Sequence, residues 1–228
     1  MSDNSALKLL AMEDSGSVTG TDPGVFSSIY NADINMAIWQ RSLDLPTQVY
    51  VASLIKSPPV FQTLQAVMQE GEIAPWLSAH LPNRRGKPAL IADISRLCKM
   101  FSVLFDLERI GLRMALLSQA MCPRFHVDHI PCRMVTTYGG PATEWLENNR
   151  VDRTRLGKGG KAKSDDQSDV FHSPRHISQL TVGDVALLKG ESWHGNEGRG
   201  AVHRSPPMPS GAARLMLSLD FGESIQPE

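Results

Sequence analysis

The chain has 228 residues, of which 41% are hydrophobic and 21% charged, and its formal net charge is −1. This length is sufficient for one domain with a full core, and the near-neutral charge gives no electrostatic reason to expect a nucleic-acid or membrane partner. Three cysteines, an odd number, argue against a disulfide framework and suit a reducing compartment, so we expect a cytoplasmic protein.

The first half of the chain is predicted to be a mobile segment followed by helices. Residues 1–30 are rich in Ser, Gly, Asp and Thr, which is typical of a mobile segment, and their early acidic side chains exclude a signal peptide. The stretch SPPVFQTLQAVMQE (57–70) places apolar side chains at helical spacing after two prolines. The stretch LIADISRLCKMFSVLFDLERIG (90–111) predicts the clearest helix, ending at a Gly111 cap. We expect a helical part over about 31–110.

After Gly111 the apolar side chains occur in short extended segments separated by Gly and Pro. These segments are LRMALLSQ, FHVD, CRMVTTY, HISQLTVGDVALLKG, GAVHRS and ARLMLSLDF, and they predict six to eight strands. Helices that pack on one face of such a β core would bury both apolar surfaces. The predicted fold class is therefore α+β, with the β core over about 111–228 and one domain over 31–228.

The stretch CPRFHVDHIPCR (122–133) concentrates side chains that bind metals. On a strand, His126 and Asp128 point to the same face. A distant histidine would complete a set of two nitrogens and one carboxylate, which leaves coordination positions open and is typical of non-haem Fe(II) oxygenases. We favour His203, in an apolar segment, over His194, which lies among glycines. The sequence therefore predicts a metal site made of His126, Asp128 and His203.

Arg214 begins the apolar segment RLMLSLDF, eleven residues after His203. On a strand, Arg214, Met216, Ser218 and Asp220 would share one face. A buried guanidinium is costly unless it meets an anion, and a dicarboxylate would offer it a planar partner.

The order His126-x-Asp128, His203, Arg214 resembles the motif of the Fe(II)/2-oxoglutarate-dependent oxygenases. The resemblance implies a double-stranded β-helix of the cupin-like or jelly-roll kind, with the N-terminal helices packed on it. It also implies Fe(II) and 2-oxoglutarate as cofactors, with the three metal-site residues catalytic and Arg214 anchoring the far carboxylate of 2-oxoglutarate.

The same resemblance implies a hydroxyl partner for that carboxylate. We expect Ser218 or Tyr138 to supply it. The sequence departs from the family here, because the usual hydroxyl lies two residues after the arginine, where this chain has Met216.

Longer strings are similar to an uncharacterised bacterial family called domain of unknown function 1826. These strings cover much of the chain: NMAIWQR, CPRFHVDHIPCR, TYGGPATEWL, GDVALLKGE and GRGAVHRSPP. The resemblance brings no established activity and implies an association with metal-homeostasis proteins. It leaves open an oxygenase that acts on an unknown small molecule or protein, and a non-catalytic zinc-handling protein that uses the same triad.

Two further zinc hypotheses follow from neighbouring residues. Cys122, His126, His129 and Cys132 form a C-x3-H-x2-H-x2-C set of ligand types that tetrahedral zinc accepts, although structural zinc usually has two pairs separated by a longer loop. A zinc-dependent hydrolase would need a general base, for which we name Glu144. The sequence lacks a glycine-rich phosphate loop and a G-x-S-x-G elbow, which argues against a nucleotide or serine hydrolase.

Overall fold

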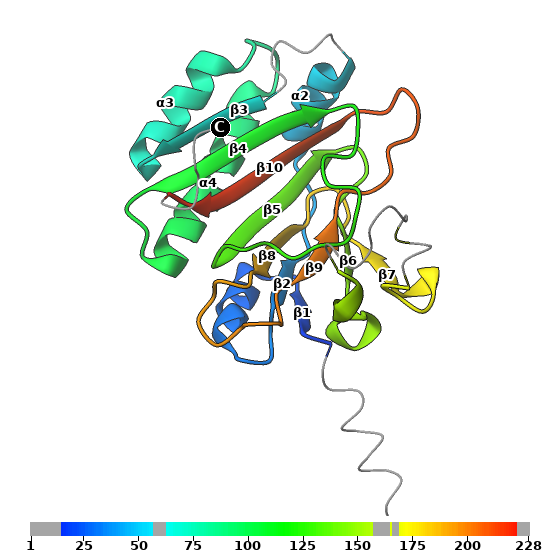
Figure 1. The fold of residues 1–228 in the computed structure, drawn as a ribbon. Helices are drawn as coiled ribbons and strands as arrows, with labels where there is room; N and C mark the ends of the chain where they lie inside the picture. Colours follow the sequence, from blue (N-terminus) through cyan, green and yellow to red (C-terminus); the bar gives the residue numbers. More distant parts are fainter. Residues whose placement is uncertain (1–14, 57–62, 157–164, 166–168, 223–228) are drawn as a thin grey trace, which may run out of the picture.

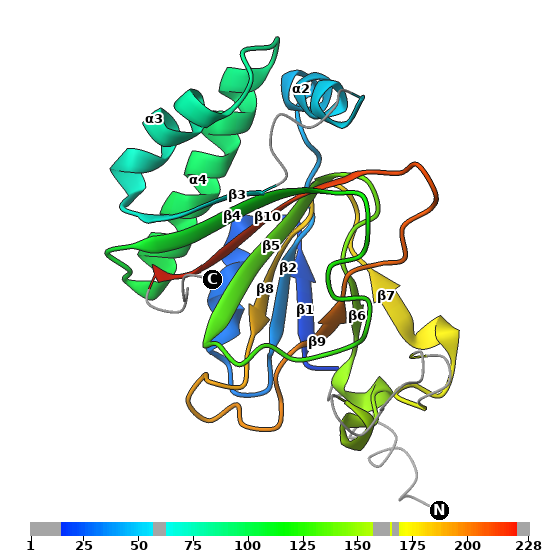
Figure 2. The ribbon, with the colours of Figure 1, turned by 45° about the horizontal axis from the view of Figure 1, so that its top comes forward.

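The computed structural model describes residues 15–56, 63–156, 165 and 169–222. A seven-stranded sheet carries helices on one face and a three-stranded sheet on the other (Figures 1 and 2). Within these described residues, no helix combines the length and the apolarity that crossing a bilayer requires.

The larger sheet contains strands from both halves of the chain. Its order is β1-β2-β8-β5-β10-β4-β3, and all neighbours are antiparallel except β1 and β2. The bounds are β1 Ser17–Gly20, β2 Met36–Trp39, β3 Thr63–Met68, β4 Ile110–Leu117, β5 Cys132–Gly139, β8 Val185–Lys189 and β10 Arg214–Phe221.

The smaller sheet has the order β7-β6-β9 and is antiparallel throughout. Its strands are β6 Glu144–Leu146, β7 Ile177–Gln179 and β9 Val202–Arg204. The helices are α2 Leu45–Lys56, α3 Glu70–His80 and α4 Lys87–Phe105, and the short 3-10 helices are η1 Pro23–Tyr30, η2 Asn148–Arg150, η3 Arg153–Arg155 and η6 Pro174–His176.

Strand alternation divides the larger sheet into an apolar face under the helices and a more polar face toward the smaller sheet. On β10, Leu215, Leu217 and Leu219 pack into the core below the helices. The alternate residues of β10 line a pocket on the other face, as the sequence predicts: Arg214, Met216, Ser218 and Asp220. The period of two on this strand therefore positions the site.

The expected division into a helical part before residue 110 and a β core after it is wrong. Strands β1, β2 and β3 belong to the first part and pair into the same sheet as the later strands. The helix predicted over 57–70 is wrong for residues 63–68, which form β3, while residues 57–62 lie outside the described residues. Leu64 and Met68, four residues apart, fit both a helical spacing and a period of two, and pairing with β4 decides the outcome.

Two boundaries also differ from the sequence prediction. Residues 1–14 lie outside the described residues, but 15–30 form β1 and η1, with Phe26 and Ile29 buried in the core, because the sheet gains an edge strand there. Helix α4 ends at Phe105 and not at Gly111. Its cap is Asp106, which adopts a left-handed conformation with φ 52°.

Candidate metal centre

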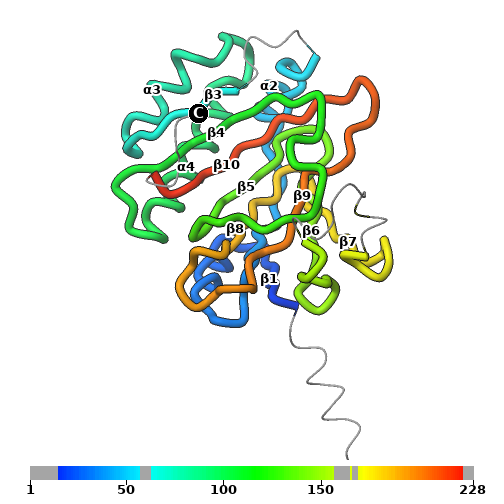
Figure 3. Tube along the Cα trace, viewed as in Figure 1, coloured from blue at the N-terminus to red at the C-terminus, as the bar shows by residue number. Residues whose placement is uncertain are grey.

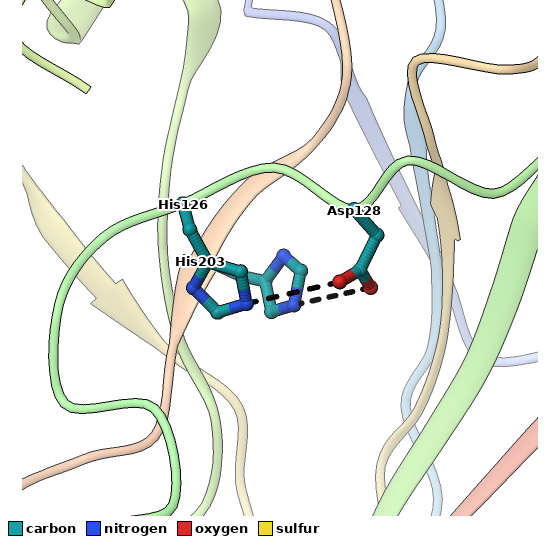
Figure 4. A group of neighbouring side chains, drawn as sticks. All are labelled: His126, Asp128 and His203. Carbon is teal, nitrogen blue, oxygen red and sulfur yellow. Dashed lines mark ion pairs between the residues drawn. The ribbon is translucent and has the colours of Figure 1, made fainter. Parts of the chain in front are cut away.

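Three side chains from two distant segments converge between the sheets. His126 and Asp128 lie on the connection 118–131 between β4 and β5, which passes beside β9 (Figure 3). His203 lies on β9, and one ligand atom from each of the three residues lies within 4.8 Å of the others. Both imidazoles point toward the Asp128 carboxylate (Figure 4), whose oxygens lie 3.8 Å from His126 Nε2 and 3.6 Å from His203 Nε2. The structure thus brings together the triad that the sequence predicts.

The two histidines are joined by their backbones. His126 N–H donates to the His203 carbonyl over 3.1 Å, and His203 N–H donates to the His126 carbonyl over 3.0 Å. This isolated antiparallel bridge takes the place of the strand that the sequence predicts over FHVD. The reciprocal pair fixes the spacing of the two backbones from which the imidazoles extend.

Each imidazole directs its Nε2 toward the Asp128 carboxylate. His126 Nδ1 lies 2.9 Å from the Arg124 carbonyl, and His203 Nδ1 lies 3.0 Å from the Ala201 carbonyl. A carbonyl oxygen only accepts, so each Nδ1 carries the proton and each Nε2 keeps its lone pair. Burial lowers the pKa of His203 to about 4, against the opposing charge of Asp128, so this imidazole is neutral near pH 7. Neutral nitrogens and a carboxylate are the donors that a divalent metal needs, and the site therefore fits one.

Arg133 holds the carboxylate of the triad in place. Its Nη1 donates to Asp128 Oδ2 over 2.9 Å, and its Nε and Nη2 donate to the two oxygens of Asp220 over 2.7 and 3.0 Å. The Arg133 guanidinium therefore faces two carboxylates. Arg133 is thus placed as an outer partner of Asp128, a candidate metal ligand.

A pocket of about 220 Å³ opens beside the triad. Its wall combines the two histidines with polar and apolar residues of the larger sheet and the 118–131 connection. The lining residues are Gln65, Arg113, Met121, Cys122, His126, Arg133, Val135, Thr143, His203, Arg204, Ser205, Arg214, Met216, Ser218 and Asp220.

Arg214 is a buried cation in this pocket without an acidic partner among the described residues. Its side chain is 2% exposed, its Nη2 donates to Thr143 Oγ1 over 2.8 Å and to Thr137 Oγ1 over 3.2 Å, and its Nε is buried with no partner. Burial lowers the pKa of Arg214 to about 10, so the group is still charged at pH 7. An unmade hydrogen bond from a buried group costs about 1–3 kcal/mol, and an anion bound in the pocket would remove that cost.

The structure separates the two hydroxyls expected beside Arg214. Ser218 is buried and lines the pocket. Tyr138 lies on the opposite face of β5, where its hydroxyl donates to Asp93 Oδ2 of α4 over 2.8 Å, so its expected role is wrong. Thr137, one residue earlier, faces Arg214 instead, and the hydroxyls of Thr137 and Thr143 both accept hydrogen bonds from it, a contact that the sequence does not predict.

The compact cysteine and histidine set is not assembled. Among the described residues the one metal-competent group of three or more is the triad. Cys132 is 0% exposed and belongs to the core, where burial raises its pKa, whereas Cys122 is exposed at the pocket. His129 and His194 are both exposed, and neither joins the triad.

Glu144 does not serve as a general base at this site. One of its carboxylate oxygens accepts a hydrogen bond from Arg204 Nε over 2.7 Å, and Glu144 is not among the residues that line the pocket. Arg204 also donates to Asp165 over 2.9 Å and stacks on Phe125. The hydrolase hypothesis loses the one base named for it.

Comparisons with known proteins agree on the fold and on the family. Two solved structures are similar to this chain with a TM-score of 0.50. The dioxygenase for auxin oxidation from rice has 10% identity, with 90% of this chain and 82% of that chain covered. The dioxygenase for auxin oxidation 1 from Arabidopsis thaliana, solved with 2-oxoglutarate, has 9% identity, with 93% and 92% covered. The fold is therefore the α+β double-stranded β-helix of 2-oxoglutarate oxygenases, as the sequence predicts.

At the level of sequence, a search of curated proteins gives no match. A family model described as "Protein of unknown function (DUF1826)" matches residues 20–220. This match extends over most of the chain, and it includes the triad and Arg214. The chain belongs to the DUF1826 family.

Proposed function

We propose that this protein is an Fe(II)- and 2-oxoglutarate-dependent oxygenase. One observation carries the proposal: the pocket that His126 and His203 of the triad line also holds the buried guanidinium of Arg214, whose Nε has no hydrogen-bond partner among the described residues. A metal-binding protein without a cosubstrate needs the triad but has no use for the buried charge of Arg214. A dicarboxylate that reaches the metal at one end would satisfy Arg214 at the other.

Each group then has a defined task. His126, Asp128 and His203 would hold Fe(II), and Arg214 would bind the far carboxylate of 2-oxoglutarate, with Thr143 fixing the orientation of its guanidinium. When bound, Fe(II) and 2-oxoglutarate supply the oxidising chemistry, with dioxygen as oxidant and succinate and carbon dioxide as products. The protein contributes the positions of these groups and a partly apolar wall, including Val135 and Met216, that limits water.

Binding and turnover are tested separately. Anaerobic protein is loaded with Fe(II), 2-oxoglutarate is titrated while the weak visible charge-transfer band is recorded, and succinate is measured after oxygen is admitted. We expect a saturable band followed by succinate. Tight zinc binding with neither band nor succinate would favour the non-catalytic zinc-handling alternative, and the association with metal-homeostasis proteins stays a prediction.

The cosubstrate anchor has its own variant and control. Arg214→Gln removes the charge and should weaken 2-oxoglutarate binding by about tenfold or more, since hydrogen bonds to charged groups contribute about 1.5–3 kcal/mol. Metal affinity should be unchanged. Arg96→Gln removes a half-exposed arginine on the helical side and is the matched control. Equal 2-oxoglutarate affinity in the two variants would contradict the anchor.

A further inference from the structure

A second arginine of the pocket has no acidic partner among the residues that the structure describes, and the proposed function does not use it. Four arginines line the pocket. Arg133 binds Asp128 and Asp220, and Arg204 binds Glu144 and Asp165. Arg113 and Arg214 are the two that form no ion pair with a described residue.

Arg113 is built into the sheet and not placed on a flexible loop. It lies on β4, where its register partners are Ser218 of β10 and Gln65 of β3. All three line the pocket, from the buried Ser218 to the exposed Gln65. Arg113 itself is half-buried and its Nε is buried with no hydrogen-bond partner. A guanidinium, a hydroxyl and an amide thus form one row of hydrogen-bond donors that reaches the accessible edge of the pocket.

The carboxylate near Arg113, that of Asp220, is already bound by Arg133. Burial raises the pKa of Asp220, and Arg133 and, more weakly, Arg113 oppose that shift. The Asp220 carboxylate has both oxygens bound to Arg133, and it forms no ion pair with Arg113. The orphaned Nε therefore needs an acceptor from outside the described chain.

Arg113 and Arg214 extend into the pocket from different levels along the sheet. Arg113 is level with Ser218, and Ser218 lies four residues from Arg214 on β10. At about 3.4 Å per residue this places the two Cα atoms on the order of 14 Å apart. The cosubstrate carboxylate that Arg214 takes under the proposed function leaves Arg113 for another molecule.

We propose that Arg113, with Ser218 and Gln65, forms a subsite for an oxyanion, a carboxylate or a phosphate, of the substrate that is oxidised. The subsite rests on the proposed function only in its assignment to the substrate. The remaining wall beside it includes Met121, Val135 and Met216, so the substrate carries an apolar body next to its anionic group.

The test uses simple probes on the full-length protein. Benzoate, phenyl phosphate and the neutral benzamide are titrated by calorimetry against protein loaded with Mn(II), with and without 2-oxoglutarate. We expect at least one of the two anions to bind about tenfold or more tightly than benzamide. The stronger of the two identifies the group as a carboxylate or a phosphate.

Variants then locate the binding. Arg113→Gln should weaken binding of that anion by about tenfold or more, and should leave benzamide and 2-oxoglutarate affinities within about twofold. Arg113→Lys should recover part of the loss, and a thermal melt checks that both variants fold. The subsite is overturned if both anions bind no better than benzamide, if Arg113→Gln leaves anion affinity unchanged, or if this variant abolishes 2-oxoglutarate binding.

The two proposals fail in different ways. Arg113-dependent anion binding without any binding of 2-oxoglutarate would support the subsite and refute the cosubstrate. Arg214-dependent binding of 2-oxoglutarate without Arg113-dependent anion binding would support the cosubstrate and refute the subsite.

Discussion

Arg133 donates a hydrogen bond to Asp128, the carboxylate of the triad, over 2.9 Å while both oxygens of Asp220 occupy the rest of its guanidinium. The metal carboxylate is therefore positioned by a cation that is itself fixed by a second carboxylate. Because Asp220 is buried on β10, the alignment of Asp128 depends on the central part of the larger sheet.

Removing Arg133 should loosen the metal site. Arg133→Gln leaves Asp220 buried without its cation, and Asp128 loses its orienting donor. Outer partners of metal ligands typically change metal affinity by about 10–100-fold, so we expect a loss of that size in competition with a chelator. Asp220→Asn keeps an acceptor oxygen for Arg133 but removes its charge, so the loss should be smaller than in Arg133→Gln. Arg96→Gln, on the helical side, is the control and should retain the full metal affinity. An unchanged metal affinity in Arg133→Gln would refute this positioning role.

Thr143 should tune cosubstrate binding without touching the metal. Thr143→Val keeps the shape but removes one of the two acceptors of Arg214 Nη2, and Thr137 remains as the other. A hydrogen bond to a charged group contributes about 1.5–3 kcal/mol, and only part of that should be lost from cosubstrate binding. We expect 2-oxoglutarate affinity to fall by about three- to tenfold and metal affinity to stay constant. Thr136→Val is the matched control because the Thr136 hydroxyl is buried with no partner. A larger effect at Thr136 than at Thr143 would contradict the assignment.

Gly190 should be required for the connection that carries Asp128. Its position is crowded, since an added Cβ would lie 2.0 Å from the Ile130 carbonyl oxygen and 2.7 Å from the Asp128 carbonyl oxygen. Gly190→Ala must therefore displace this connection, and we expect both a lower melting temperature and weaker metal binding. Gly71→Ala, on α3, has open space around it and no positive φ, and it tests the general cost of adding a methyl group at a glycine. If both variants bind metal equally well, the close approach at Gly190 does not matter for the site.

Stability in acid should depend on Asp93. Burial acts to raise the pKa of Asp93. The charge and hydrogen bonds of Arg41 outweigh burial, and Tyr138 and Arg96 add further hydrogen bonds, so the pKa lies below its ordinary value of 3.8. A carboxyl group whose pKa is lower in the folded protein than in the unfolded chain stabilises the fold at pH values above its unfolded pKa. This contribution is lost as the pH falls through the pKa of the folded protein.

We expect the wild type to lose free energy of unfolding below about pH 4 and Asp93→Asn to show a flatter pH dependence there. At pH 7 the variant should be less stable by about 3–5 kcal/mol, because Arg41 loses its buried partner. Urea unfolding across pH 3–7 measures both effects. Parallel pH profiles would show that Asp93 is not responsible.

Local sequence patterns predict several residues of the site. The choice of His203 over His194 followed from the apolar residues around it, and the shared face of Arg214 and Ser218 followed from strand alternation alone. Such patterns depend only on neighbours along the chain, and the fold preserves them.

Other features depended on partners distant in sequence. Both faces of β5 are buried, so alternation could not tell whether Tyr138 or Thr137 meets Arg214. Thr143 precedes β6, and its contact with Arg214 arises only when the smaller sheet packs on the larger one. The sequence of β3 is compatible with a helix as well as with a strand, and it forms a strand because it pairs with β4.

The backbone bridge between His126 and His203 divides the site into a fixed and an adjustable half. Two nitrogen donors stay in register when the ion leaves, because main-chain bonds hold them together. Replacement of one divalent ion by another would then begin at the Asp128 carboxylate, because its position depends on a hydrogen bond from the Arg133 side chain. If an ion were removed, the two backbones would still hold the nitrogen donors side by side, and a divalent ion would bind again without a rearrangement of the main chain.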